Sequence, residues 1–335
     1  MILSSFVLVF EAGKALVKKQ ESCVKLILLL LQTNPQDNLT FPHLGEERVV
    51  DGRQLFFRAE VGILSRNIII QGDHDDNLCP KADLADDGLT KLSCNQFGAQ
   101  MFMHSPGHES LVVRLSNFEL RNGGQAFRLG RYALHWHMIG NLKQSYQRNI
   151  SIHHSWNRGV AVHGINYLRV QHNFVYNIRG HTFFIEDGPE EHNWLEGNLA
   201  IKTIPSMNLL NTDQTPACFW IVSCRQYILN NHAVASRRYG LWIRPEISAT
   251  GTSVNTPDVH PINIPILKFR GNQAHSNGKY GLRVFDEFLP NEPSVITDLF
   301  VWRNGMVGWT ATKVGKLGFD GILLLCLQLI QGQEC

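Results

Sequence analysis

The sequence lacks most of the features that assign a function class directly. Neither sign of charge dominates, because 31 Lys and Arg residues nearly balance 29 Asp and Glu residues and leave a net charge of +2. Nucleic-acid-binding domains usually carry a basic excess, so we expect no nucleic-acid partner. The seven cysteines include no CxxC pair, which argues against a zinc site built from thiolates.

No hydrophobic run is long enough to cross a bilayer as a helix. The apolar runs at 24–31 and 321–330 are shorter than the roughly 20 residues that a membrane helix needs. The apolar start, residues 1–10, has no basic segment before it and no small-residue cleavage site, so it is not a clear signal peptide. We expect no membrane span within this chain.

Two features agree with an extracellular chain. Cys79 and Cys94 flank a polar, Asp-rich loop, where they could form a disulfide in an oxidising compartment or remain free thiols. Sequons for N-glycosylation begin at Asn38 and Asn149, although such short motifs also arise by chance.

A repeated pattern runs through the middle of the chain. Five segments of alternating apolar residues each end on an asparagine. A polar stretch and then a second short apolar strand complete the pattern. The asparagines are Asn173, Asn198, Asn231, Asn272 and Asn304. Strands this short cannot bury a face alone and must stack, and asparagine suits the bend because it tolerates the left-handed conformation and its amide can bond to the next rung.

The repeat predicts an all-β fold, a right-handed parallel β-helix over residues 51–310. A β-sandwich is the alternative, but its hairpin signals are weaker than the long-range repeat. Insertions at 202–216 and 245–265 are expected to loop out from one edge of the solenoid. Residues 1–50 lack the rung pattern, and residues 311–335 are expected to be an irregular tail.

Polar residues form a column at the end of the second strands. Alignment places His137, His163 and Asp187 in register, and a slip of one residue would bring Glu186 there instead. Equivalent positions of stacked rungs lie about 4.8 Å apart. His135 shares a strand face with His137, because side chains two residues apart point the same way.

Three interpretations of this column remain open. It could bind a divalent cation, Zn²⁺ or Ca²⁺, through His135, His137, His163 and Asp187. It could be an acid–base site on a polysaccharide groove, where a carboxylate raises the basicity of a histidine. It could also be a ladder of polar side chains that bond only to one another at the solenoid edge.

Other side chains near the column are candidates for glycan contact. Arg128 and Arg131 could bind a carboxylate bidentately, or could pair with Glu119 or Glu186. Trp136 could stack on a sugar ring, although a place in the core is the usual one for tryptophan. Two residues of later rungs, Arg244 and Asp286, fall near the same column.

Five motifs resemble one known family, and they occur at 60–67, 124–132, 134–137, 183–188 and 213–220. They are similar to the G8-domain, right-handed β-helix family to which fibrocystin-L belongs, and more distantly to its CEMIP-type hyaluronan-depolymerising members. The resemblance covers roughly residues 51–290. It implies an extracellular β-helix preceded by a G8 domain, of which residues 1–50 could hold only the end. The chain is then expected to be a fragment of a membrane-anchored cell-surface protein of the ciliary or plasma membrane.

The resemblance implies two leading functions. The first is an extracellular module of a receptor-type protein that binds glycan or matrix, hyaluronan being one candidate. The alternative is a hyaluronan-degrading glycosidase with His163, Glu186 and Asp187 in acid–base or ligand roles and Asp187 and Asp286 as its two carboxyl groups. A third option is a polysaccharide lyase, with an Arg or His base beside a uronate that Ca²⁺ neutralises.

Overall fold

The computed structural model describes residues 8–10, 45–50, 52–72, 97–105, 111–126, 128–206, 211–256 and 258–325. The cysteines of the expected disulfide, Cys79 and Cys94, and the asparagine of the first sequon, Asn38, lie outside the described residues. The chain divides into two units, residues 1–65 and 66–335. None of the helices among the described residues is long and apolar enough to cross a membrane.

The first unit contains two small pairs of strands. β2 (Glu46–Val50) and β3 (Arg53–Phe57) form an antiparallel hairpin, and β1 (Leu8–Phe10) pairs in parallel with β4 (Val61–Ile63). The expected start of the β-helix at residue 51 therefore differs from the structure, because residues 53–57 pair with the preceding strand instead of stacking as a rung.

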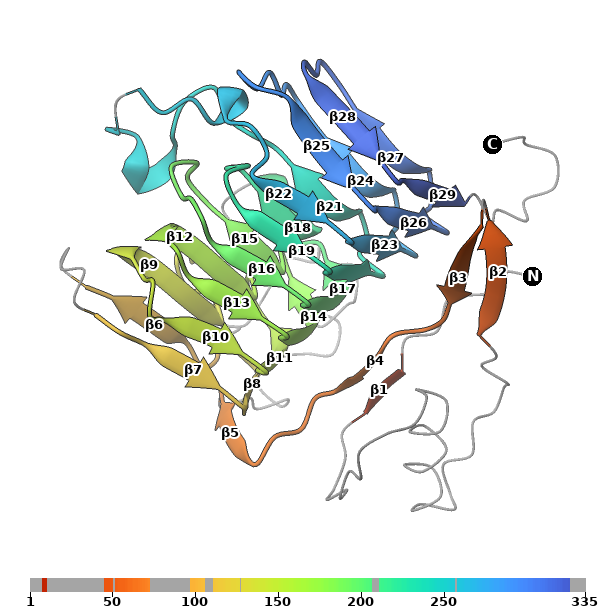
Figure 1. Cartoon of the computed structure of the whole chain (residues 1–335). Helices are drawn as coiled ribbons and strands as arrows, with labels where there is room; N and C mark the ends of the chain where they lie inside the picture. The colour runs from red at the N-terminus through yellow and green to blue at the C-terminus, as the bar shows by residue number, and fades with distance from the viewer. Residues whose placement is uncertain are drawn as a thin grey trace, which may run out of the picture. The chain divides into compact units, whose positions relative to one another are not determined.

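The second unit is a right-handed parallel β-helix made of three sheets (Figure 1). One sheet contains β7 (Arg114–Ser116), β10 (Tyr146–Arg148), β13 (Arg169–Gln171), β16 (Trp194–Glu196), β19 (Tyr227–Leu229), β22 (Lys268–Arg270), β25 (Ser294–Thr297) and β28 (Leu317–Asp320). The next contains β5 (Ile68–Gln71), β8 (Phe118–Arg121), β11 (Ser151–Ser155), β14 (Phe174–Arg179), β17 (Leu199–Ile204), β20 (His232–Val234), β23 (Gln273–His275), β26 (Phe300–Trp302) and β29 (Leu323–Leu325).

The third sheet, called the site sheet below, positions the candidate functional residues. It contains β6 (Met101–His104), β9 (Leu134–Asn141), β12 (Val160–Asn166), β15 (Phe183–Ile185), β18 (Ala217–Ile221), β21 (Tyr239–Ile243), β24 (Tyr280–Val284) and β27 (Val307–Ala311). The described parts of the insertions between rungs contain the 3-10 turns η2 (Asn211–Gln214), η3 (Gly251–Ser253) and η4 (Pro261–Asn263). In each complete rung, the third and last strand belongs to the site sheet.

The rungs continue beyond residue 310, where an irregular tail was expected. β28 pairs with β25, and β29 pairs with β26, both in parallel. The alternation of apolar residues in 317–325 lets these strands extend two of the three sheets by one more rung, although no asparagine marks the turn between them.

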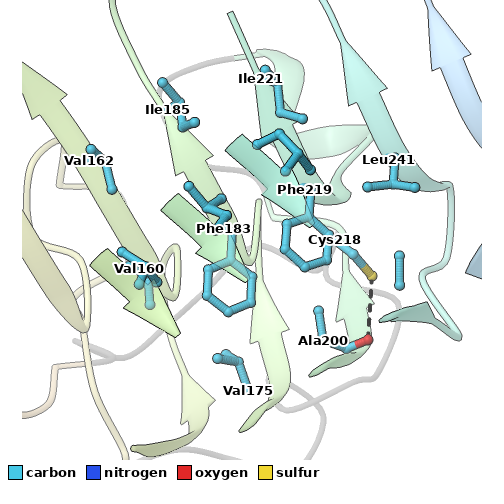
Figure 2. Packing of buried hydrophobic residues seen from close by; sticks show 14 of the residues in the cluster. Val160, Val162, Val175, Phe183, Ile185, Ala200, Cys218, Phe219, Ile221 and Leu241 are labelled. Carbon is cyan, nitrogen blue, oxygen red and sulfur yellow. Dashed lines mark hydrogen bonds between the residues drawn. The ribbon is translucent and has the colours of Figure 1, made fainter. Parts of the chain in front are cut away.

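Apolar side chains from all three sheets fill the interior of the solenoid. Figure 2 shows Val160, Phe183 and Phe219 from neighbouring rungs of the site sheet, with Val175 and Ala200 facing them from the next sheet. The rings of Phe183 and Phe219 are stacked, with centroids 4.8 Å apart. Like residues thus stack on like residues from rung to rung, which is how such short strands bury a continuous core.

The asparagine repeat forms a buried ladder of hydrogen bonds. The Asn173 side chain donates to Asn198 Oδ1 at 2.9 Å, Asn198 donates to Asn231 Oδ1 at 3.0 Å, and Asn231 donates to Asn272 Oδ1 at 3.1 Å. The prediction that asparagines bond along the stack is confirmed for these four. The fifth differs, because Asn304 accepts from Asn277 at 3.0 Å and so belongs to a second ladder at the next corner.

The left-handed residue at this bend is the one before the ladder asparagine. The φ angles of His172, Gly197, Asn230 and Gly271 are 53°, 62°, 51° and 68°. Asn149 holds the equivalent place one rung earlier, with φ of 53°, and is exposed between β10 and β11. The second sequon therefore begins on an exposed turn residue, and its glycosylation remains a prediction.

Candidate functional site

Three histidines lie together on the outer face of the site sheet. β9 and β12 pair so that His163 is opposite His137 and Val162 is opposite Trp136. Because side chains alternate along a strand, Trp136 and Val162 point into the core while His135, His137 and His163 point outward. The His137 ring lies 4.8 Å from that of His163 and 5.0 Å from that of His135, centroid to centroid.

The carboxylate in register with this column is Glu186. Val162 is opposite Ile185, so the next position pairs His163 with Glu186, and Asp187 follows one residue later. The predicted alignment of Asp187 is therefore off by one residue, as the considered slip anticipated. Both carboxylates nevertheless contact His163: Glu186 Oε2 lies 3.5 Å from Nδ1, and Asp187 Oδ2 lies 2.8 Å from Nε2.

The insertion at 245–265 covers the Asp187 side of the site. Thr252 Oγ1 lies 2.8 Å from His163 Nε2, and the Ser253 amide donates to Asp187 Oδ2 at 3.0 Å. Only glycine fits at position 251, because its φ is +57° and a Cβ there would lie 2.1 Å from Asp187 Oδ1. A segment far along the chain thus completes the surroundings of the histidine.

The pKa values of the two carboxyl groups are shifted in opposite directions. Burial raises the pKa of Glu186, and the neighbouring Arg158 and His163 offset this only in part. Burial also acts to raise the pKa of Asp187, but hydrogen bonds from His163 and Ser253 outweigh it and hold that pKa below its usual range. One group that keeps a proton more readily and one that stays ionised, on either side of an imidazole, form an arrangement capable of acid–base chemistry.

A buried polar network adjoins Glu186. The Arg158 guanidinium is fully buried and binds Asp213 bidentately, with Nε–Oδ1 at 3.1 Å and Nη2–Oδ2 at 2.8 Å. It donates to the Tyr132 hydroxyl at 2.9 Å, and its Nη1 lies 3.8 Å from Glu186 Oε1. Arg158 therefore joins the first insertion, which carries Asp213 on η2, to the carboxylate beside His163.

His181 lies at the far end of this network and predicts an acid-sensitive fold. Burial lowers its pKa to about 3, so folded His181 stays neutral while the unfolded side chain takes up a proton below about pH 6.5. A depressed histidine pKa contributes stability above the unfolded pKa and loses it as pH falls. We expect each pH unit below about 6 to cost about 1.4 kcal/mol through this residue.

The variant His181→Asn tests this expectation. The side-chain oxygen of the new asparagine can accept the hydrogen bond that the Ala217 amide now donates to His181 Nδ1 at 3.1 Å. Urea unfolding at pH 7, 6 and 5 should show a slope of stability against pH that is smaller by about one proton in the variant. Equal slopes in the two proteins would show that His181 does not cause the dependence.

Within the part of the chain that the structure describes, the group of side chains that could hold a metal is His135, His137 and His163. One ring nitrogen from each lies within 4.8 Å of the other two. His104 extends the column by one rung, because it is opposite His137 on β6. His104 was not predicted from the sequence as part of the column. The pattern of Met101–His104 matches that of Leu134–His137, and aligning the two segments would have placed His104 opposite His137.

The structure separates the other predicted residues. Trp136 is wrong as a glycan contact, because it is fully buried in the core and its Nε1 donates to Gln147 at 3.0 Å. Arg128 and Arg131 are exposed in the loop before β9, as a glycan contact requires. Neither forms the ion pair considered for it with Glu186, whose partners are Arg158 and His163.

Asp286 and Arg244 form a separate group further along the site sheet. The Arg244 Nη2 lies 3.9 Å from Asp286 Oδ2, at a cavity of about 500 Å³ that Phe285 and Lys313 also line. Asp286 follows β24 and Asp187 follows β15, three rungs apart, which corresponds to roughly 14 Å. That separation exceeds the spacing of paired glycosidase carboxyls, about 5–9.5 Å, so the suggested pair does not fit.

Known proteins share this β-helix. Fibrocystin-L of Mus musculus is 34% identical over 86% of this chain, which covers 7% of that protein. Cell surface hyaluronidase CEMIP2 of Homo sapiens is 32% identical over 75% of this chain, covering 20% of that protein. The human cell migration-inducing and hyaluronan-binding protein gives the same identity and the same shares.

The chain thus spans only a small part of the curated relatives that it resembles, between 7% and 20% of their length. The family model for the CEMIP β-helix matches residues 96–282, which include the histidine column, both carboxylates and the two insertions that pack against them. The chain therefore belongs to the CEMIP β-helix family and is a β-helix module of the kind found in fibrocystin-L.

Proposed function

We propose that this module binds an acidic glycan along the outer face of the site sheet, outside the cell, as part of a cell-surface protein. The observation that carries the proposal is the rim of exposed cationic and aromatic side chains beside the histidine column. Phe102 is 54% exposed, and its ring lies 5.3 Å from that of His135 and 5.2 Å from that of His137. Exposed aromatic rings provide the flat apolar surface on which sugars stack.

The cationic part of the rim belongs to the same site. The loop with exposed Arg128 and Arg131 also supplies the Gly130 carbonyl, which lies 3.0 Å from His135 Nδ1. A guanidinium binds a carboxylate through two parallel hydrogen bonds, as a uronate sugar would allow. Further along the same face, Arg244 lies at the cavity that Phe285 and Lys313 line, where it would extend the contact with a long glycan chain. Names of two relatives, one a hyaluronidase and one hyaluronan-binding, support hyaluronan as the first glycan to test.

Reversing the charge of the rim should weaken binding. We expect the double variant Arg128→Glu/Arg131→Glu to bind hyaluronan oligosaccharides about 5–30-fold more weakly at low salt, because each exposed ion pair contributes up to about 1 kcal/mol. The difference should shrink as salt is added. Affinity is measured by calorimetry, and an exposed arginine on another sheet, Arg169→Glu, serves as the control. Equal weakening by the control would reject the rim as the contact surface.

Cleavage of hyaluronan is the second candidate, and the pair of carboxylates on His163 favours it. Glu186, with a raised pKa, is the candidate acid, and His163 paired with ionised Asp187 is the candidate base. Size-exclusion chromatography of hyaluronan incubated with the chain, with and without Ca²⁺, tests the activity. Chains of unchanged length would reject it, and cleavage that survives His163→Gln would reject the assignment of residues.

A further inference from the structure

His135 presents a buried lone pair to the histidine column. Its Nδ1 lies 3.0 Å from the Gly130 carbonyl oxygen, which can only accept, so Nδ1 carries the proton and Nε2 does not. The residue is 2% exposed, and Nε2 has no hydrogen-bond partner among the described residues. An unpartnered buried acceptor costs free energy, and neutral imidazole in this tautomer is a metal ligand.

His163 is oriented in the complementary way. Its Nε2 lies 2.8 Å from the ionised Asp187 carboxylate, to which it donates, and its other nitrogen, Nδ1, faces Glu186. Histidines that bind metals almost always donate their second N–H to a carboxylate or a backbone carbonyl. His163 donates to the Asp187 carboxylate and His135 donates to the Gly130 carbonyl. Both histidines therefore already have the hydrogen-bond partner that orients a metal ligand.

Glu186 supplies a fourth donor on the same side. Its Oε2 is buried, accepts no hydrogen bond from the described residues, and lies 3.5 Å from His163 Nδ1. His137 lies between the other two histidines and is only half-buried, which leaves the site open toward solvent. Three imidazole nitrogens thus lie within 4.8 Å of one another on the site-sheet surface, and the Glu186 oxygen lies beside His163, one of the three.

We propose that His135, His137 and His163 bind one divalent transition-metal ion, of which Zn²⁺ is the simplest, with Glu186 as the fourth ligand. Imidazole and carboxylate are ligands that Zn²⁺ prefers, whereas Ca²⁺ takes oxygen ligands almost exclusively. Tetrahedral bonds of about 2.1 Å place ligand atoms about 3.4 Å apart, so nitrogens now within 4.8 Å of one another must approach by up to about 1.4 Å through side-chain rotation. Asp187 then orients His163 and does not bind the ion. The site does not depend on glycan binding.

Titration of the chelator-treated chain with Co²⁺ tests the proposal directly. Tetrahedral Co²⁺ with nitrogen and oxygen ligands absorbs in the visible range, and we expect one equivalent to give this band and one equivalent of Zn²⁺ to abolish it. Absence of a visible band at micromolar protein and Co²⁺ would overturn the proposal. A strong near-ultraviolet thiolate band would overturn it too, because it would place the ion on cysteines.

Two variants and one control locate the ion. His137→Gln changes a half-buried side chain and is expected to fold normally, yet to weaken Co²⁺ binding at least about 100-fold. Asp187→Asn removes the charge that orients His163 and is expected to weaken binding about 10–100-fold. His172→Asn alters an exposed histidine at another corner, where φ of 53° suits asparagine, and should leave binding unchanged. Wild-type affinity in His137→Gln would contradict the assignment.

A thermal measurement separates binding from folding. Without metal, His137→Gln and the wild type should melt at nearly the same temperature, since His137 is only half-buried and its side-chain hydrogen bond, to His104, is exposed. Zn²⁺ should raise the melting temperature of the wild type and of His172→Asn, because it binds the folded state, and should leave that of His137→Gln unchanged. An equal rise in all three would show that the ion binds elsewhere.

Discussion

Replacing Arg158 with methionine is expected to lower the free energy of unfolding by about 3–5 kcal/mol. Methionine retains the apolar stem over the Phe184 ring, where the guanidinium carbon now lies 3.7 Å from the centroid. The Asp213 carboxylate then stays buried without the cation that binds it through two hydrogen bonds. An uncompensated buried charge is the main cost, and urea unfolding at pH 7 measures it.

An exposed ion pair provides the matched control. Arg270 Nε lies 3.0 Å from Asp298 Oδ2, with side chains 61% and 40% exposed, so Arg270→Met should cost less than about 1 kcal/mol. Adding Asp213→Asn to Arg158→Met should restore part of the loss, because the orphaned charge is removed. If Arg158→Met costs no more than Arg270→Met, the buried network does not hold the first insertion to the site sheet.

Removing one rung of the asparagine ladder is the second large effect. Asn198→Ala should cost about 2–5 kcal/mol, because two fully buried backbone groups lose their partners. These are the Asn173 amide, which donates to Asn198 Oδ1 at 3.0 Å, and the Val170 carbonyl, which accepts from Asn198 Nδ2 at 2.8 Å. Unfolding in urea gives the change, and an unaltered m-value would show that the folded state is still compact.

The control for the ladder is an asparagine at the surface. Asn291 is exposed in the loop before β25, and Asn291→Ala should change stability by less than about 0.5 kcal/mol. Similar losses in the two variants would mean that the ladder contributes no more than an ordinary surface asparagine. The stacking of rungs would then rest on the apolar core alone.

The scaffold could be predicted because its signals are local and repeated. Alternation of apolar residues fixes which side chains enter the core, and Asn173, Asn198 and Asn231 recur at one corner of each rung. Asn304 misled because two corners use asparagine, so one residue type marks two different ladders. Residues 317–325 were missed because their turn carries no asparagine.

The site was predicted less completely, for a physical reason. Side chains alternate along each strand and the rungs stack in register, so counting residues in the sequence is enough to place His135, His137 and His163 on one face. Glu186, and not Asp187, is in register with His163. The alternation of side chains along a strand could not show this, because β15 ends at Ile185 and the chain turns there. Partners from the insertions, such as Asp213 and Thr252, follow no period, so no sequence signal pairs them with Arg158 or His163.

The most direct test of glycan binding on the site sheet compares two aromatic patches in one assay. Phe102 lies beside the histidine column, whereas Trp194 and Tyr227 are stacked at 4.1 Å on a neighbouring sheet. Calorimetric titration with hyaluronan oligosaccharides should give at least about tenfold weaker binding for Phe102→Ala, since an aromatic contact contributes about 1.5 kcal/mol or more with its buried area. Trp194→Ala should bind like the wild type. Full binding by Phe102→Ala, or its loss in Trp194→Ala, would contradict the proposed face.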